Sequence, residues 1–575
     1  MAGIWLSVLI GGLLILFTVV ALTGSVAKRT VDVKSHSVLK LELSGAIGDR
    51  ATEQSLMEVI QTDFEQALSL SEIVSAIRKA ESDERIEGIV LDMSGLSAGL
   101  AQCEELMDAI NEFKTSGKWV WAYSDSYSQA DYFIATAADK IYLNPIGMVD
   151  IHGLSAKVLY FKELLDKVGV NVQVVKVGTY KSAVEPFLLN GMSDANREQI
   201  DHFLGRMWDQ VTAVMAKSRS VTVDTVNVWA DSFAFAMSPS RYVDDKIVDK
   251  LVYRREFDEM VAKQTGEEEP AYVSLADYKS GFSFGGNKKA DKKVAVLYAL
   301  GDITESADEG IASDRLVPQI LKLADDETID GLVLRVNSGG GSAFASEQIW
   351  DALQQYKKKT GNPFYVSMGD MAASGGYYIS CGADKIYASP LTLTGSIGIF
   401  GIIPDVQPLM KEKLGVNMAT VATNTGSFPD ILQPMTEQQR GAMQSYVDRG
   451  YDLFVSRCAA GRKMTKEEIC KIAEGRVWDG LSALENGLVD ELGGLRSTLN
   501  GIAGALGTDY ESLEIVEYPE QSDKWWMALS ALNSEAAARI MSGVVDRQSM
   551  IYATIARRVR NLDPLQCRMN SMIIK

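Results

Sequence analysis

The 575-residue sequence predicts an α/β protein built as a tandem duplication of one domain. Three observations predict this fold class. The segment DYFIATAADKIYLNP, starting at Asp131, recurs as GYYISCGADKIYASP, starting at Gly376, an offset of 245. Upstream, IEGIVLDMSG at Ile86 matches IDGLVLRVNS at Ile329, an offset of 243. In both copies apolar β-rich runs alternate with amphipathic helical patterns, as in α/β domains.

Each copy has the order β, α, β, α, β. The expected strands are GIVLDM, KWVWAYS and KIYLN in the first copy and GLVLRVN, PFYVSMG and KIYAS in the second. The helix after the first of these strands has apolar residues at i, i+4 and i+7, which form one buried face. These residues are Leu106, Ile110 and Phe113 in the first copy and Ile349, Leu353 and Tyr356 in the second. Further matches, VGVN at Val168 with LGVN at Leu414 and IVDKL at Ile247 with LVDEL at Leu488, extend the duplication downstream.

The repeat divides the chain into five expected segments. Residues 1–29 form a transmembrane anchor, 35–262 the first copy and 292–500 the second copy. Residues 263–291 are the expected linker, because KQTGEEEP and FGGNKKADKK are polar and Gly-rich. Residues 501–575 are expected to form a mostly helical tail.

The first 27 residues carry no charged side chain, and IWLSVLIGGLLILFTVVALTG is long enough to cross the roughly 30 Å hydrocarbon layer as a helix. The alternative is a cleaved signal peptide, although no basic segment precedes the apolar stretch. Lys28 and Arg29 follow the span and, by the positive-inside tendency, favour a cytoplasmic body.

Composition excludes several classes of function. A net charge of −19 argues against nucleic-acid binding, because phosphate backbones attract clustered Lys and Arg. The five cysteines and the three histidines, His36, His152 and His202, are scattered without metal-ligand spacing. We therefore expect no metal and no cofactor.

The stretch MAASGG around Ser374 crowds small residues about one hydroxyl. At offset 245 Ser374 corresponds to Gln129, so only the second copy has the serine. A serine at a strand-to-helix turn suits a nucleophile, and helix capping is the alternative. The preceding RVNSGGGSAFASE, starting at Arg335, leads from a strand into a helix through three glycines, whose amides are suited to an oxyanion.

A nucleophilic serine needs a base, and no histidine follows residue 202. A lysine is the other option, provided that burial depresses its pKa. The first copy has VGTYKSAVEPF with Lys181, whereas the second has VATNTGSFPDI without a lysine. Each copy thus holds what the other lacks, and we expect the site to form where two halves meet, within one chain or between chains.

At these residues the chain resembles a known family, the long duplicated form of signal peptide peptidase A, or protease IV. YKSAVEPF, VNSGGGS, MAASGGYY, ADKIYASPLTLTGSIGI and GRVWDGLSALENGLVDELGGL are similar to its motifs. The resemblance implies a fold related to ClpP and crotonase and a Ser-Lys serine protease. Ser374 would be the nucleophile, Lys181 the general base, and Ser396 would help to hold the lysine. The oxyanion hole would comprise the amides around Gly340, Gly341 and Gly375.

The chain departs from the family at Gly339, where a proline is usual. The family further implies a single-pass protein of the bacterial inner membrane with an extracytoplasmic body, and for the orientation we follow the family rather than Lys28 and Arg29. It also implies remnant signal peptides as substrates and a homotetramer. Two other functions remain open, a crotonase-like acyl-CoA enzyme and a catalytically silent membrane scaffold.

Overall fold

A computed structural model describes residues 33–50, 68–280, 290–307, 310–519, 565–569 and 573–574 of the chain. The predicted anchor, residues 1–29, lies outside these ranges. Within them, no helix combines the length and the apolar character that crossing a membrane requires.

The first half is built on a seven-stranded parallel sheet in the order β2-β1-β3-β4-β5-β8, with β9 also paired to β1. The middle of its central strand β3, residues 88–91, is apolar and buried, as expected for a parallel sheet covered on both faces. The strands are β1 (Ser37–Gly48), β2 (Leu68–Ser69), β3 (Ile86–Ser97), β4 (Trp119–Ser124), β5 (Lys140–Leu143), β8 (Lys250–Leu251) and β9 (Tyr272–Ser274). The covering helices include α3 (Leu70–Ser82), α4 (Leu100–Lys114), α5 (Gln129–Ala135) and α11 (Arg254–Thr265).

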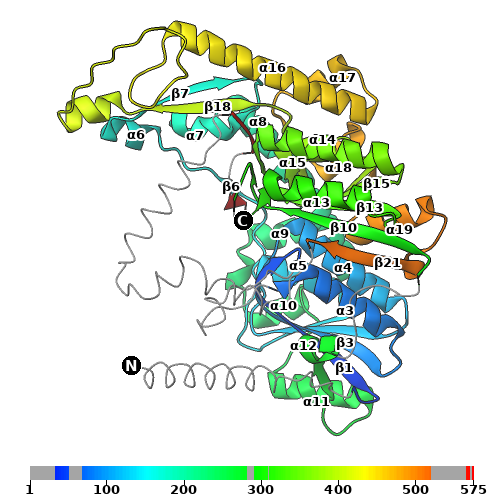
Figure 1. The fold of residues 1–575 in the computed structure, drawn as a ribbon. Helices are drawn as coiled ribbons and strands as arrows, with labels where there is room; N and C mark the ends of the chain where they lie inside the picture. The colour runs from blue at the N-terminus through cyan, green and yellow to red at the C-terminus, as the bar shows by residue number, and fades with distance from the viewer. Residues whose placement is uncertain are drawn as a thin grey trace, which may run out of the picture.

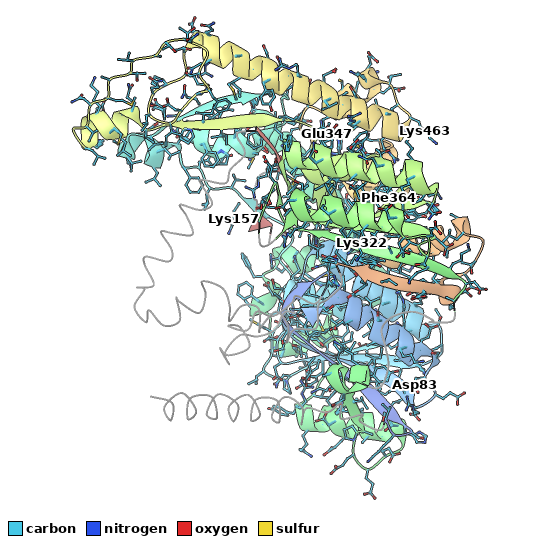
Figure 2. The ribbon with its side chains drawn as sticks, viewed as in Figure 1. Asp83, Lys157, Lys322, Glu347, Phe364 and Lys463 are labelled. Carbon is cyan, nitrogen blue, oxygen red and sulfur yellow. The ribbon has the colours of Figure 1, made fainter. Side chains whose placement is uncertain are left out.

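The second half repeats this plan in an eight-stranded sheet, β19-β17-β15-β13-β10-β21, with β16 also paired to β15 and β20 paired to β16. The strands are β10 (Lys292–Leu300), β13 (Gly331–Ser338), β15 (Phe364–Ala373), β16 (Lys385–Ala388), β17 (Leu393–Gly395), β19 (Val477–Asp479), β20 (Glu491–Leu492) and β21 (Leu513–Tyr518). The helices that cover it include α13 (Ser313–Asp325), α14 (Ala343–Thr360), α15 (Gly375–Ser380) and α19 (Leu495–Ala505). Phe364 is fully buried under these helices, whereas Lys322 on α13 is exposed (Figure 2).

The duplication predicted from the sequence is present in the topology. The two ADKIY segments form β5 and β16, and IVDKL and LVDEL lead into β8 and β20, which pair with them in parallel. The structure therefore confirms an α/β architecture of two like halves. In Figure 1 the sheet of the first half, with β1 and β3, lies below the sheet of the second half, with β10, β13 and β15 in green and β21 in orange.

The first half sends one arm across to the second. Its strand β7 (Asn171–Lys176) pairs antiparallel with β18 (Phe400–Asp405), from Lys176 opposite Phe400 to Asn171 opposite Asp405 (Figure 1). Both belong to a six-stranded sheet in the order β12-β11-β14-β22-β18-β7. Its other strands are β11 (Ile303–Thr304), β12 (Ile311–Ala312), β14 (Gly340–Ser342) and β22 (Leu565–Arg568). We call β7 and the residues that follow it as far as Lys181 the arm, and residues 338–342 of the second half the glycine loop. The arm brings the first half close to this loop.

Other helices complete the two halves and the arm. They are α6 (Lys162–Val168), α7 (Glu185–Leu188), α8 (Asp194–Arg219), α9 (Val223–Asp231), α10 (Pro239–Asp244), α16 (Glu437–Arg462), α17 (Lys466–Ile472) and α18 (Gly480–Glu485).

Elements of the structure cross two of the expected boundaries, and residues 281–289 and 520–564 lie outside the described ranges. The expected linker, 263–291, contains β9 and α12 (Leu275–Ser280), and β9 extends the first sheet because its backbone pairs with β1. The expected helical tail, 501–575, begins inside α19 and continues as β21, which pairs with β10 and buries Leu513 under that helix. Its other described residues form β22 and β23 (Ile573–Ile574), the latter paired with β6 (Ala156–Lys157). Short edge strands of this kind form only through their partners, which a local sequence pattern does not reveal.

Candidate active site

Ser374 lies at the turn between β15 and α15 with φ 58° and ψ −113°, a strained conformation for a residue with a side chain. Its amide donates to the Gly395 carbonyl at 2.8 Å, which fixes the turn. The side chain makes no capping hydrogen bond to α15 and is fully buried. The alternative of a helix cap therefore fails, and the hydroxyl is directed elsewhere.

The small residues around Ser374 allow the glycine loop to pack directly against it. A Cβ at Gly375 would lie 3.1 Å from the Gly341 nitrogen and 2.8 Å from Ser346 Oγ. A Cβ at Gly376 would lie 2.8 Å from the Ser338 carbonyl oxygen. The space around the hydroxyl is thus occupied by backbone of the loop, which larger residues would displace.

The buried amine of Lys181 meets Ser374 across the two halves of a single chain. Its Nζ donates to Ser374 Oγ at 2.7 Å, to the Ser396 carbonyl at 3.0 Å and to Ser396 Oγ at 3.1 Å. Lys181 is 1% exposed and Ser396 2%. The predicted base, nucleophile and supporting serine therefore lie together, with the amine held at a distance that permits proton transfer.

The arm that carries Lys181 is fixed by residues that the sequence reasoning did not single out. Gly475 has φ +80°, and a Cβ there would lie 2.7 Å from the N, Cα and Cβ atoms of Lys181. The Tyr180 amide donates to the Glu474 carbonyl at 2.9 Å, and Gln199 Nε2 to the Tyr180 carbonyl at 3.1 Å. Gly475 begins the GRVWDG motif, so its signal was present in the sequence, whereas Gln199 lies on α8 with no local signal.

The three predicted oxyanion donors lie together, since a Cβ at Gly375 would be 3.1 Å from Gly340 Cα and from the Gly341 nitrogen. Gly341 is next to Gly375, as the 3.1 Å approach above indicates. The Gly340 amide instead donates to Ser338 Oγ at 3.1 Å, and Gly340 has φ +97°. Gly341 and Gly375 are accordingly the better candidates for binding an oxyanion.

The C-terminal strand β22 lies along the glycine loop. It pairs antiparallel with β14, with Gly341 opposite Cys567 and Gly340 opposite Arg568, and the Met569 amide donates to the Gly339 carbonyl at 2.8 Å. The other edge of β22 pairs with β18. An extended peptide backbone therefore fits between β14 and β18.

The histidines contact other groups. His36 Nδ1 is bonded to Glu87, His152 Nδ1 lies 3.1 Å from Asp150, and His202 Nε2 lies 3.3 Å from Ser482 Oγ. Among the residues that the structure describes, no three His, Cys, Asp or Glu side chains are grouped so as to hold a metal ion.

The corresponding place in the first half has no nucleophile. Gln129, the counterpart of Ser374, accepts from the amides of His152 and Gly153, both at 2.9 Å. Asp131 is fully buried and accepts from the Gly95 and Leu96 amides at 3.0 and 2.9 Å. Here the side chains stabilise a loop.

Comparison with known proteins identifies the family of the chain. The chain matches Peptidase family S49 over residues 112–267 and 356–507, more than half of its length, and Clp protease over residues 291–393. It is 36% identical to Protease 4 of Haemophilus influenzae over 511 residues, which cover 86% of this chain and 83% of that protein. Protease 4 of Salmonella typhi is 37% identical over 481 residues (80% and 76%). The chloroplastic serine protease SPPA of Arabidopsis thaliana is 27% identical over 484 residues (80% and 68%).

The chain therefore belongs to peptidase family S49 and is a serine peptidase. Similarity to the Protease 4 sequences over both halves confirms the predicted resemblance to the long form of signal peptide peptidase A. Neither an acyl-CoA enzyme nor a silent scaffold agrees with this family.

Proposed function

We propose that the protein is a membrane-anchored endopeptidase that cuts remnant signal peptides or other short apolar peptides with a Ser374–Lys181 dyad. The observation that carries this proposal is the 2.7 Å contact between Lys181 Nζ and Ser374 Oγ, both fully buried and contributed by different halves of the chain. A buried lysine beside a strained serine matches what nucleophilic catalysis without histidine requires.

In acylation, neutral Lys181 takes the proton of Ser374 Oγ as the oxygen attacks the scissile carbonyl carbon. The oxyanion of the tetrahedral intermediate is stabilised by the Gly341 and Gly375 amides. Lys181 then gives the proton to the departing amine, which leaves an ester on Ser374. A water molecule deprotonated by Lys181 attacks this ester, releases the carboxylic acid and restores the serine. Ser396, which accepts from Nζ through both its carbonyl and its hydroxyl, keeps the amine aimed at Ser374.

The position of β22 supports an extended peptide as substrate. A substrate strand would add to the β14 edge, so its main chain would bind independently of sequence and its side chains would provide selectivity. An apolar peptide left in a bilayer reaches such a groove most readily in an anchored enzyme, and the apolar residues 4–24 provide the proposed single-pass anchor in the bacterial inner membrane. The body is assigned to the extracytoplasmic side, as the family resemblance implies.

A homo-oligomer, a tetramer by family resemblance, is supported by an unmatched arm. The counterpart of β7 in the second half, residues 417–422, forms no strand and exposes Met418 and Val421. Exposed apolar residues on an extended segment favour association. Pairing of this segment with a neighbouring copy would repeat the β7–β18 arrangement between chains.

A serine-directed fluorophosphonate tests the nucleophile. The label should map to Ser374 by mass spectrometry, and Ser374→Ala and Lys181→Ala should each abolish peptide cleavage in an intact assembly. Lys162→Ala, at an exposed lysine of the same half, is the matched control and should keep its activity. Peptide cleavage retained by purified, folded Ser374→Ala would refute the assignment.

Mixing the two inactive chains tests whether one chain forms the whole site. Mixed oligomers of Lys181→Ala and Ser374→Ala should stay inactive, because the amine and the hydroxyl belong to the same chain. Recovery of cleavage would instead assign the dyad to two neighbouring chains.

A further inference from the structure

The strand that delivers Ser374 has an irregularity just before the serine. Along β13 and β15, Val336 pairs with Met368 but Ser338 pairs with Ala372. Residues 369–371 therefore lie opposite Asn337 alone. Such a bulge bends a strand and redirects the side chains that follow it, and it leaves backbone groups without ladder partners. Ser374 follows two residues after the ladder resumes.

The side chain of Asn337 fills the gap left by the bulge. Its Oδ1 accepts from the Met371 amide at 3.2 Å, and its Nδ2 donates to Asp49 Oδ2 at 2.7 Å and to Asp370 Oδ2 at 3.4 Å. A Cβ on Gly369 would lie 3.1 Å from Asn337 Cγ, so the amide group fits closely against the bulged strand. One side chain thus accepts from a backbone amide of the bulge and ties the bulged strand to two carboxylates.

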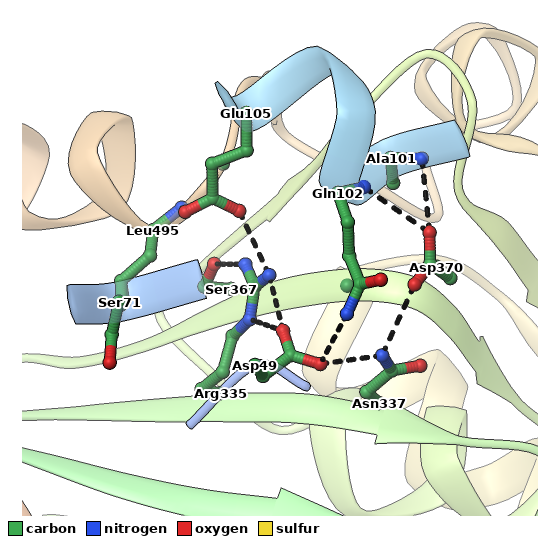
Figure 3. Close-up of polar contacts among 12 residues, drawn as sticks. Asp49, Ser71, Ala101, Gln102, Glu105, Arg335, Asn337, Ser367, Asp370 and Leu495 are labelled. Atoms are coloured by element: carbon green, nitrogen blue, oxygen red, sulfur yellow. Dashed lines mark hydrogen bonds and ion pairs between the residues drawn. The ribbon is translucent and has the colours of Figure 1, made fainter. Parts of the chain in front are cut away.

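Asp370, in the middle of the bulge, binds the other half of the chain (Figure 3). Its Oδ1 accepts from the Ala101 and Gln102 amides at 3.0 and 3.3 Å, in the first turn of α4, where a carboxylate is favoured. Gly99 makes this approach possible, because a Cβ there would lie 2.0 Å from Asp370 Oδ1. The bulge is therefore fixed from outside its own sheet.

Arg335 anchors the same network two residues before Asn337. Its guanidinium donates to Asp49 at 2.6 and 2.8 Å, to Glu105 at 2.8 Å and to Ser367 Oγ at 2.9 Å, and it is 2% exposed (Figure 3). Asp49 and Glu105 come from the first half, whereas Arg335 and Ser367 lie on β13 and β15. Buried ion pairs add little net stability, but they tolerate only one arrangement of their partners.

We propose that Asn337 and Asp370 are positioning residues that hold the bulge of β15 against the first half and thereby set the direction of Ser374. The proposal rests on the proposed role of Ser374 as nucleophile. Neither side chain touches the dyad in the structure, so both act through the backbone between residues 369 and 374. Docking of the first half would then contribute to catalysis twice, through Lys181 directly and through α4 by way of Asp370.

The test compares steady-state cleavage and the fluorophosphonate labelling rate in the full-length protein. Asn337→Ala and Asp370→Ala should lower kcat and the labelling rate about 10- to 100-fold, as small misplacements of reacting groups do, with KM within about threefold. Asp370→Asn keeps an acceptor for the α4 amides and should restore kcat to within about threefold of wild type.

The matched control is Asn362→Ala. Asn362 Nδ2 donates to the Ile329 carbonyl at 2.6 Å and so joins the same two strands at their opposite ends. Its loss should lower the unfolding midpoint as much as Asn337→Ala does, yet leave kcat unchanged. Equal losses of kcat in the two variants, or wild-type kcat and labelling in folded Asn337→Ala, would overturn the proposal.

Asn337→Asp provides a second measurement should the alanine variant fold poorly. It keeps the volume and the acceptor for Met371, but it loses the donor that faces Asp49 and Asp370, near the charge of Arg335. Its kcat relative to wild type should be low at neutral pH and rise as the pH falls, because a protonated carboxyl donates again. A ratio that does not change with pH would contradict the hydrogen-bonding role. Labelling of the wild-type protein at another residue would refute Ser374 as the nucleophile. Labelling at Ser374, with wild-type kcat and labelling rate in the Asn337 variants, would refute only the positioning role of Asn337.

Discussion

Replacing Gly475 by alanine should slow catalysis although Gly475 supplies no reacting group. The new Cβ would lie 2.7 Å from three atoms of Lys181, whereas carbon atoms normally approach to about 3.5–4.0 Å. The backbone at Lys181 must therefore retreat by about 1 Å. The Nζ–Oγ distance would grow from 2.7 Å beyond the roughly 3.2 Å limit for proton transfer through a hydrogen bond.

The expected loss in kcat is about 100-fold, the effect typical of a 1 Å misplacement. Alanine at φ +80° also costs roughly 1–2 kcal/mol of folding free energy, so stability needs its own control. Gly117→Ala provides it, because Gly117 has φ +83° but nothing within 4 Å of its Cβ position. In urea titrations Gly117→Ala should show the cost of the backbone conformation alone and Gly475→Ala at least as great a loss, and only Gly475→Ala should lose kcat. Wild-type turnover in Gly475→Ala, or equal loss in both, would refute this reasoning.

Three further predictions follow from the same structure. Peptide cleavage should rise toward alkaline pH, because Lys181 must be neutral and an unperturbed lysine has a pKa of about 10.4; a profile set by an ionisation near about 6.5 that disappears in His152→Ala would contradict this. Burial, with the charge of Asp49, raises the pKa of Asp370 to about 6, so the folded state holds this proton more tightly than the unfolded chain. The contribution of Asp370 to the free energy of unfolding should therefore fall by on the order of 2 kcal/mol as the pH rises from about 4 through 6. Urea titrations of wild type and Asp370→Asn measure this fall as a change with pH in the difference between their unfolding free energies. A difference that does not change with pH would contradict the prediction. Ending the chain before residue 564 should speed fluorophosphonate labelling of Ser374 several-fold, because β22 pairs along the glycine loop where a ligand would enter. An unchanged labelling rate in the folded, shortened protein would show that β22 does not compete with the ligand.

Much of the site could be predicted because each of its two main residues lies in a recognisable motif that only one of the two copies contains. Ser374 and Lys181 each lack a counterpart in the other half, and the structure brings them within 2.7 Å. The pairing of β7 with β18 was not predictable, since VGVN and LGVN look alike, yet only the first leads into a strand in the structure. Local sequence does not say which partner a strand will find.

The buried network between the halves was also missed, although one signal for it exists. Arg335 interrupts the apolar run GLVLRVN, and a charged residue in a strand buried on both faces needs an ionic partner. The partners, Asp49 and Glu105, lie more than 200 residues away, with no local pattern to identify them.

The two halves also differ at a position that packs against the glycine loop, Asp131 in the first half and Gly376 in the second. Asp131 and Gly376 begin the two matched segments and so correspond to each other. In the first half the Asp131 carboxylate occupies the amides of Gly95 and Leu96, a loop that corresponds to the start of SGGGS. An internal anion thus occupies the two amides that correspond to those of Ser338 and Gly339. Gly376 has no carboxylate to place there, and the Gly341 and Gly375 amides are the proposed partners of an acyl oxygen. With Gln129 at the position of the serine and the Asp131 carboxylate bound to the loop, the first half lacks the proposed nucleophile, and its proposed reacting group is the amine of Lys181.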